Sequence, residues 1–210
     1  MAYPQTVARL TRSESQARTR AHLVATAREL FLVDGYAATS LERVAEAAGF
    51  SKGAVYSNFT GKNELCTVVL DEIRAEKIAE IADVMSAATT EAKLQRFEEW
   101  AEKVVGDVGW TSLEAEFGLQ VRRDEHLRGE QSARISGIVA LAGAGLTAIA
   151  DNGDIVLPIS PDEAAVALLS LGMGLGVLRA VDPSIPVRGL IDTIRVMAGL
   201  PPNSAGPVEV

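Results

Sequence analysis

The sequence predicts an all-helical protein in which a long helix joins an N-terminal three-helix head to a C-terminal helical body. Apolar residues recur at helical spacing along most of the 210 residues, and Gly, Pro, Asn and Asp separate the periodic segments. Hydrophobic residues make up 48% of the chain and charged residues 23%, as expected of a globular protein with a proper core. We expect a flexible arm over 1–13, the head over 14–61, the body over 62–200 and a flexible tail over 201–210.

The first helix of the head is predicted from Glu14 to Gly35. Its apolar face follows the i, i+1, i+4, i+7, i+8 pattern and consists of Leu23, Val24, Ala27, Leu30 and Phe31. Glycine readily adopts the left-handed conformation that ends a helix, so Gly35 is a suitable C-cap.

Residues 45–59 have the pattern of a helix-turn-helix. Gly49 suits the turn, and Ser51 can cap the helix that follows. In that helix Val55 and Phe59 are four residues apart and share a face that can be buried. The opposite face is formed by Lys52, Gly53, Tyr56 and Ser57. A basic, hydrogen-bonding face of this kind suits the DNA major groove, whereas the alternative is an ordinary antiparallel helix pair.

Two further helices flank this motif. Thr39 and Glu42 resemble a capping box for the helix before the turn, although Ser40 is an equally good cap. An apolar stripe predicts a long helix from Lys62 to about Met85. At 1.5 Å per residue this helix spans on the order of 35 Å, which is enough to join the head to a separate body.

The net charge of −8 is unevenly distributed along the chain. The first 63 residues hold eight Lys and Arg against five Asp and Glu, a net charge of +3, whereas the remainder carries −11. Because the neutralisation of DNA phosphates requires Lys and Arg, the part with the helix-turn-helix is also the part with the suitable charge.

The order of these motifs resembles the N-terminal domain of the TetR family of bacterial transcription regulators. The resemblance covers roughly residues 16–66 and rests on Gly-Tyr-Ala-Ala-Thr-Ser, Val-Ala, Ala-Gly-Phe-Ser-Lys-Gly, Val-Tyr, Phe and Lys-Asn-Glu-Leu at the family's spacing. The rest of the chain resembles the family only in being helical. The resemblance implies a homodimer that binds a double-stranded DNA operator and usually represses transcription until a small-molecule effector releases it.

The resemblance also implies which side chains contact DNA. Those that would approach base edges are Lys52, Gly53 and Ala54. Those that would contact the DNA backbone are Thr39, Ser40, Tyr56, Asn58 and Lys62. Ser57 lies on the same face, and Ser57 and Asn58 replace the larger aromatic or histidine side chains that are frequent in the family. Glu42 is acidic on a face that the family can turn toward DNA, where it can accept from a cytosine amino group or serve only the helix cap.

Five further helices are predicted in the body. They are expected over about 91–105, from Thr111 to the polar residues 122–126, from there to Ile149, from Pro161 to Ala180, and from about Pro186 to Gly199. Uncharged runs over 135–150 and 164–178 are shorter than the roughly 20 residues that cross a bilayer, so we interpret them as buried helices. The polar N-terminus shows no signal peptide.

Two sets of residues in the body are candidates for a ligand site and a dimer interface. Residues suited to line an apolar cavity, or else plain core, are Phe97, Trp100, Trp110, Phe117, Arg122 and His126. The resemblance implies that the last two helices pair with their mates in a four-helix bundle, through Leu168, Leu171, Leu175 and Leu178. Glycines inside the apolar helices of the body, such as Gly143 and Gly174, each cost about 1 kcal/mol relative to alanine, so we expect them to serve dimer packing or to leave space for a ligand.

The sequence shows no constellation for catalysis or metal binding. His22 and His126 lie in different regions, and metal-ligand spacings, phosphate loops and nucleophile elbows are missing. We therefore expect a non-enzyme without cofactor or metal. The lone Cys66 excludes an internal disulfide and favours a reducing, cytoplasmic compartment.

The function predicted is that of a sequence-specific DNA-binding regulator, most simply a repressor that a small molecule releases from its operator. One alternative is an activator or a ligand-independent regulator that acts through protein contacts. Another is an enzyme or ligand-sequestering body with a vestigial head.

Overall fold

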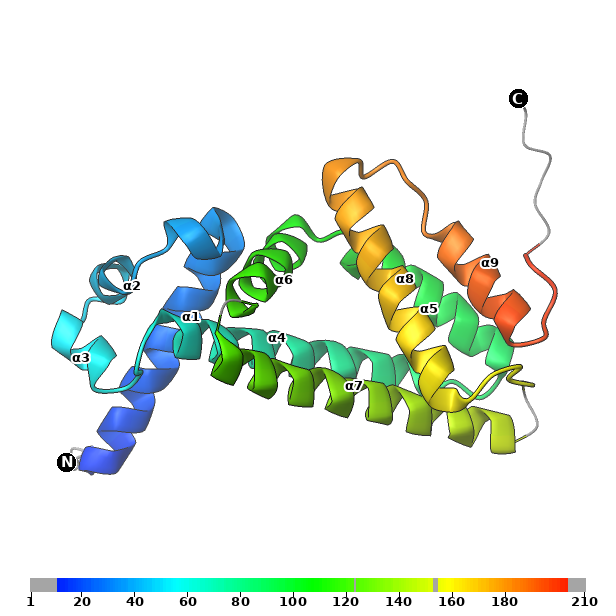
Figure 1. Cartoon of the computed structure of the whole chain (residues 1–210), viewed down its shortest axis with the longest axis horizontal. Helices are drawn as coiled ribbons and strands as arrows, with labels where there is room; N and C mark the ends of the chain where they lie inside the picture. Colours follow the sequence, from blue (N-terminus) through cyan, green and yellow to red (C-terminus); the bar gives the residue numbers. More distant parts are fainter. Residues whose placement is uncertain (1–10, 123, 153–154, 204–210) are drawn as a thin grey trace, which may run out of the picture. The chain divides into compact units, whose positions relative to one another are not determined.

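The protein is all-helical, and this prediction from the sequence is confirmed. The computed structural model describes residues 11–122, 124–152 and 155–203, and within these ranges the chain forms nine helices and no strand (Figure 1). The chain divides into two compact units, of which the first ends at Ala75 and the second begins at Glu76. The first unit is therefore longer than the head that the sequence delimits at residue 61.

Helix α1 (Arg12–Ala38) begins within the predicted arm, of which residues 1–10 lie outside the described part of the chain. Thr11 and Glu14 form a reciprocal capping box, in which Thr11 Oγ1 accepts from the Glu14 N–H at 3.2 Å and Glu14 Oε2 accepts from the Thr11 N–H at 2.7 Å. Gly35 leaves the helical conformation with a φ of 84°, as its predicted role at the end of the helix requires.

Helices α2 (Leu41–Ala47) and α3 (Lys52–Tyr56) form the predicted helix-turn-helix. Ser40 and Ser51 cap them, since each side chain accepts a hydrogen bond from the backbone N–H of the third residue of its helix. Gly49 adopts a φ of 71° in the turn, a conformation that costs glycine little.

Helix α4 (Lys62–Met85) begins in the first unit and ends in the second. Its buried residues within the first unit are Leu65, Cys66, Thr67, Val69, Leu70 and Ile73. Those of the helices before it include Leu23, Ala27, Phe31, Val44, Val55 and Phe59, all of which are at most 2% exposed. These apolar side chains form the hydrophobic core of the first unit.

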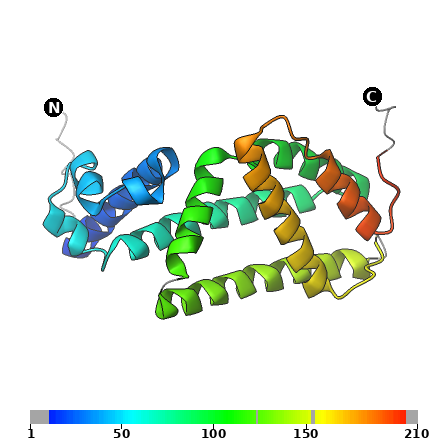
Figure 2. The same cartoon turned by 45° about the horizontal axis from the view of Figure 1, so that its top comes forward.

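The second unit holds the end of α4 and the five remaining helices. They are α5 (Thr90–Val104), α6 (Val108–Val121), α7 (Glu125–Asp151), α8 (Pro161–Val181) and α9 (Arg188–Met197). Of the helix pairs described, α7 and α8 make the most extensive contact, and Figure 2 shows α8 starting beside the C-terminal part of α7.

The caps of α6 and α8 differ in how well the sequence predicts them. Helix α8 starts as expected with Pro161 in its first turn, and the structure adds a capping box between Ser160 and Glu163. Helix α6 starts earlier than the predicted cap at Thr111, because the Asp107 carboxylate accepts from a backbone N–H at 2.8 Å and initiates the helix there.

Buried Arg179 joins three segments of the body. Its Nε donates to the Val105 carbonyl at 2.8 Å, its Nη2 donates to Glu102 Oε2 at 2.9 Å, and its Nη1 donates to the carbonyl of Ile185. The end of α8 is thereby bonded to the end of α5 and to the loop before α9. Because a buried charge is stable only when it is paired and hydrogen-bonded, this set of partners fixes the arginine in one position.

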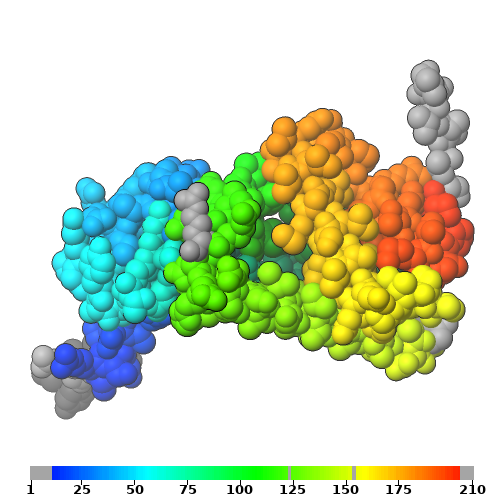
Figure 3. All heavy atoms as spheres, viewed as in Figure 1, coloured from blue at the N-terminus to red at the C-terminus, as the bar shows by residue number. Residues whose placement is uncertain are grey.

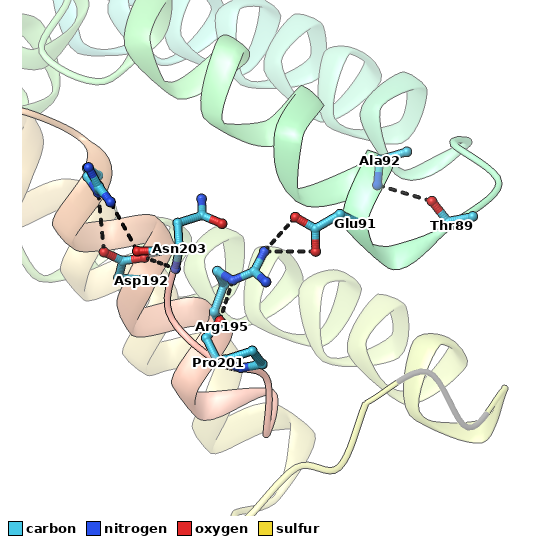
Figure 4. Close-up of polar contacts among 8 residues, drawn as sticks. Thr89, Glu91, Ala92, Asp192, Arg195, Pro201 and Asn203 are labelled. Carbon is cyan, nitrogen blue, oxygen red and sulfur yellow. Dashed lines mark hydrogen bonds and ion pairs between the residues drawn. The ribbon is translucent and has the colours of Figure 1, made fainter. Parts of the chain in front are cut away.

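Buried Arg195 performs a similar task for α9. Its Nη1 donates to both oxygens of Glu91, at 2.8 and 2.9 Å, and its Nε donates to the Pro201 carbonyl at 2.6 Å (Figure 4). The Asn203 N–H also donates to Asp192 Oδ1 at 2.8 Å. Residues 201–203, which the sequence assigns to a flexible tail, are therefore bonded to α9, whereas 204–210 lie outside the described residues.

Helices α7 and α8 are not the buried helices that the sequence predicts. Only 6% of the most apolar 18-residue stretch of α7, and 22% of that of α8, is buried within the chain. By length and composition alone, both helices could cross a membrane. Their exposed large apolar residues are Ile135, Leu141, Val166, Leu171, Met173, Val177, Leu178 and Val181. Figure 3 shows the atoms of α8, in yellow to orange, on the outer surface of this face of the body.

The glycines of α7 and α8 fall into two groups. A Cβ atom on Gly143 would collide with Asp162 Oδ1, and one on Gly176 would lie 3.7 Å from Thr111 Oγ1, so these two glycines pack against other helices of the same unit. The group with nothing within 4 Å of the Cβ position consists of Gly129, Gly137, Gly145, Gly172 and Gly174. Packing within the chain therefore explains only part of the glycine content.

Candidate nucleic-acid interface

Helix α3 has one buried and one exposed face, divided as its spacing predicts. Val55 and Phe59 are buried in the core of the first unit. The exposed face consists of Lys52, Gly53, Tyr56 and Ser57. More than half of the Tyr56 side chain is accessible, which is unusual for a large aromatic residue and leaves its hydroxyl able to bond a partner.

The end of α3 is held by bonds that the sequence does not reveal. Ser57 Oγ and Asn58 Nδ2 both donate to the Ala54 carbonyl, at 3.0 and 2.8 Å. Arg20 Nη1 donates to the Asn58 carbonyl, and the Arg20 guanidinium carbon lies 4.1 Å from the centroid of the Phe59 ring. Arg20 therefore positions α3, and contacts of Ser57 or Asn58 with DNA would replace bonds within the helix.

Thr39 faces inward, so the prediction that its side chain contacts DNA is wrong for this structure. It is 1% exposed, and its hydroxyl donates to the Gly35 carbonyl at 2.9 Å and to the Leu30 carbonyl at 3.3 Å. These two bonds satisfy the hydroxyl group, which explains how a threonine can be buried here. Its neighbour Ser40 is exposed and remains the hydroxyl that faces outward at the start of α2.

Lys62 is engaged within the head. Its Nζ donates to the Ala37 carbonyl at 3.3 Å and lies 4.1 Å from the centroid of the Tyr36 ring. The Tyr36 hydroxyl donates to Asn63 Oδ1, and burial raises the pKa of Tyr36 to about 12. A DNA phosphate would have to compete with the end of α1 for the Lys62 ammonium.

Glu64 completes the attachment of α4 to α1. Its Oε2 accepts from the Thr60 N–H at 2.7 Å and from the Thr60 hydroxyl at 2.9 Å, while its Oε1 lies 3.4 Å from Arg20 Nη2. The backbone hydrogen bond from Thr60 lowers the pKa of Glu64. Lys62, Asn63 and Glu64 thus fasten the first turn of α4 to both halves of α1.

The predicted base-reading residue Lys52 has an acidic partner. Its Nζ lies 3.5 Å from Oε1 of Glu42, and both side chains are exposed. A hydrogen bond from its own backbone N–H, together with the charge of Lys52, lowers the pKa of Glu42. The sequence places both residues in the first turn of their helices, but it does not show that these turns lie side by side.

Two of the candidate ligand-site residues lie together in the body. Phe97 and Trp100 stack with their ring centroids 5.5 Å apart. Trp100 Nε1 donates to Glu80 Oε2 at 2.8 Å, and Trp100 lines an open hollow of about 490 Å³ between α4 and α5. The other lining residues are mostly charged, namely Lys77, Glu80, Asp83, Val84, Arg96, Glu99, Lys103 and Val104. This hollow is not the apolar cavity that the sequence leads us to expect.

The other four candidates do not line this hollow. Trp110 Nε1 donates to Glu114 Oε1 at 3.3 Å within α6, and Phe117 is part of the core. Arg122 and His126 are exposed. Their nearness in sequence does not bring them together because α6 ends at Val121, and Arg122 and His126 beyond it are exposed.

The four candidate dimer leucines differ in their exposure. Leu171 and Leu178 are exposed, whereas Leu168 and Leu175 are half-buried within the body. The residues that the sequence did not single out are the exposed Val166, Met173, Val177 and Val181 of the same helix.

Comparison with known proteins identifies the first unit. Residues 23–68 match the family model described as bacterial regulatory proteins, tetR family. The matched range runs from α1 through the helix-turn-helix into the first turns of α4. Over these residues the chain is similar to the N-terminal domain of the tetR family, and we call this part the TetR head. The TetR head therefore coincides with the part of the molecule that has the exposed α3 face.

Curated relatives match the same TetR head. The HTH-type transcriptional regulator TtgR of Pseudomonas putida is 40% identical over 65 residues, which are 31% of this chain and 30% of TtgR. The HTH-type transcriptional regulator AcrR of Shigella flexneri is 37% identical over 75 residues, 36% of this chain and 34% of AcrR. The match thus spans about a third of the length of these relatives.

Solved structures extend the similarity beyond the TetR head at the level of the fold. The reduced form of E. coli NemR has a TM-score of 0.72 with 20% sequence identity, over 88% of this chain and 100% of that chain. At this identity the body shares the helical architecture, and its ligand chemistry does not follow from the comparison.

Proposed function

We propose that the protein is a sequence-specific DNA-binding transcriptional regulator of the bacterial cytoplasm. The observation that carries this proposal is the TetR-family head, in which α3 exposes Lys52 and Tyr56 while its other face is anchored in the core. Lys52 donates to base edges in the major groove, and the small Gly53 and Ala54 permit close approach of the helix. Ser40 and Tyr56 bond the DNA backbone and fix the position of the helix.

The regulator acts as a homodimer through α7 and α8 on this proposal. Their exposed apolar surface requires cover, since monomeric proteins rarely expose extended apolar patches. The glycines with open space beside them allow two such helices to cross closely. The resemblance had implied the last two helices, but α9 already buries Leu190 and Ile191 within its own body. A two-fold dimer then places its two heads on half-sites about 34–36 Å apart.

A protein partner suits this surface better than a membrane. The N-terminal third of α7 carries Glu125, Arg128, Glu130 and Arg134, charges that a bilayer would disfavour. Helix α8 is bonded through Arg179 to α5, a helix with a charged outer side.

Repression released by a small-molecule effector is the regulation that we propose. An effector that binds the body better in one state than in another releases the operator by no more than that difference in affinity. The hollow beside Phe97 and Trp100 is a place where a partly charged effector could bind.

Selection of binding sites from randomised DNA duplexes tests the proposed function. The full-length protein is expected to enrich one palindromic sequence with two half-sites. Lys52→Met should flatten the preference at one or two base pairs, by about 1–3 kcal/mol. Tyr56→Phe should weaken binding to all sequences alike. Lys103→Met, which removes one lysine from the body, is the matched control and should change neither. Failure of the folded wild-type protein to enrich any sequence would overturn the proposal.

A further inference from the structure

One exposed ion pair joins the two helices of the helix-turn-helix. Lys52 is the first residue of α3 and Glu42 lies in the first turn of α2, and their charged atoms are 3.5 Å apart. The two side chains are 67% and 45% exposed, so the pair lies on the outer surface of the head. Arg43, beside Glu42, pairs instead with Asp34 at 2.8 Å. Lys52 is thus the cation that balances Glu42.

The pair has different consequences in water and on DNA. In water an exposed ion pair adds little stability, so Lys52 can leave Glu42 at small cost. On DNA the same carboxylate lies beside phosphates, where an uncompensated negative charge opposes binding. If Lys52 turns toward a phosphate, the Glu42 carboxylate loses its ion-pair partner while it lies next to the negatively charged DNA backbone.

A G·C base pair relieves this conflict. Guanine O6 and N7 accept hydrogen bonds from a lysine in the major groove, and the N4 amino group of the paired cytosine donates in the same groove. Lys52 and Glu42 present one donor and one acceptor, close together, on the outer surface of the head, which the proposed function turns toward the groove. In an A·T or T·A pair, adenine presents an acceptor and an amino donor, and thymine presents an acceptor and a methyl group. These groups are arranged differently from those of a G·C pair.

We propose that Glu42 is a specificity-determining residue that restricts Lys52 to a G·C base pair in each half-site. Glu42 makes the use of Lys52 on phosphates or on other base pairs unfavourable, because those contacts take away the cation that is paired with its carboxylate. Discrimination then arises from a penalty on wrong sequences as well as from a contact with the right one. This inference rests on the proposed function and adds to it the base pair that α3 selects.

The test compares the full-length protein with Glu42→Gln, which keeps the length of the side chain and removes its charge. Selection from randomised duplexes with the wild-type protein should enrich G·C at one symmetric position in each half-site. In Glu42→Gln, affinity for random-sequence duplex should rise about fivefold, and the ratio of selected to random affinity should fall by a similar factor. The slope of log affinity against log salt should steepen by roughly 0.9 per head, as Lys52 becomes available to a phosphate.

Two controls separate the pair from a general charge effect. Glu46→Gln removes the same charge from an exposed position on the same helix, one turn further on, and should raise both affinities alike with an unchanged ratio. In a Lys52→Gln background, Glu42→Gln should no longer change the ratio. Glu42→Ala serves as a second variant, and circular dichroism establishes that each variant is folded.

The outcomes distinguish this inference from the function on which it rests. A wild-type protein that enriches no sequence overturns the proposed function. A wild-type protein that enriches a site, together with variants of Glu42 that retain its full selectivity, overturns only the role of Glu42. An effect of Glu42→Gln that persists without Lys52 also overturns it, because the pair would not be the cause.

Discussion

The two units of the chain differ in how completely each buries its own apolar residues. In the head, side chains from four helices meet in one core, and Phe31, Val55 and Phe59 are almost fully buried. In the body, the two most apolar helices leave most of their apolar stretches exposed, including Met173 and Val177. The comparison teaches that the head hides its large apolar side chains within the chain, whereas the body leaves an apolar surface that the proposed dimer would cover.

Removing a core side chain should lower the stability of the head. Phe31→Ala is expected to destabilise the head by about 3–5 kcal/mol, since it deletes a fully buried aromatic ring. Denaturant unfolding followed by circular dichroism should then show the head unfolding separately from the body. Val33→Ala, at an exposed position of the same helix, should stay within about 0.5 kcal/mol of wild type. Equal effects of the two changes would contradict a closed core.

A charge on the exposed apolar surface of α8 should weaken the proposed dimer. Leu178→Glu is expected to weaken dimerisation about 100-fold, because each dimer would bury two unpaired carboxylates. Sedimentation equilibrium measures this change. Val196→Glu, on the exposed side of α9, distinguishes the two possible helix pairs and should leave the dimer intact. Dissociation by Val196→Glu alone would favour the last two helices instead.

The open glycines sharpen the same comparison. Gly174→Ala should stabilise the isolated chain by about 1 kcal/mol, because alanine favours the helix and its Cβ meets nothing within 4 Å. If a second copy approaches there, the same methyl group should weaken dimerisation. At protein concentrations below the dimer dissociation constant, the unfolding free energy of Gly174→Ala should therefore be higher than that of the wild type. Its dimer dissociation constant should be larger. An unchanged dimer would show that this glycine lies outside the interface.

The smallest effect concerns the acid sensitivity of the head. The pKa of Glu64 is lowered in the folded state from its usual value of 4.5, chiefly by the hydrogen bond from the Thr60 backbone. Its contribution to stability is therefore present above about pH 4.5 and is lost as pH falls through the lower, folded-state pKa. Glu64→Gln should remove this contribution, which is less than about 1 kcal/mol for a partly exposed group. The unfolding free energy of the variant should therefore fall less steeply with decreasing pH, and we call this part of the curve the acid limb. An acid limb as steep in Glu64→Gln as in wild type would assign the pH dependence to other carboxylates.

Local chemistry made much of the head predictable from sequence. The caps Ser40 and Ser51 and the turn at Gly49 depend on neighbours a few residues away, so their patterns are visible in the chain itself. The inward and outward faces of α3 follow for the same reason. Asp107 was missed because a second plausible cap, Thr111, stands only one turn later.

Partners distant in sequence were not predictable. The bonds from Arg20 to Asn58 and from Lys62 to Ala37 join residues that only the fold brings together. Lys62, which the resemblance assigns to the DNA backbone, therefore also helps to hold the head in shape. The exposure of α7 and α8 was mispredicted because an apolar helix buried by its own chain and one left for a partner have the same sequence pattern.

Arg179 has a consequence for how α8 can be oriented about its own axis. Three of its nitrogens bond carbonyls fixed at the end of α5 and in the loop before α9, those of Val105, Glu102 and Ile185. A step of one residue along a helix turns a side chain by about 100°, so rolling α8 by that amount would separate the guanidinium from all three. The side of α8 that carries Met173 therefore stays exposed. Rotation of α8 about its axis would bury this side only by breaking the bonds of Arg179.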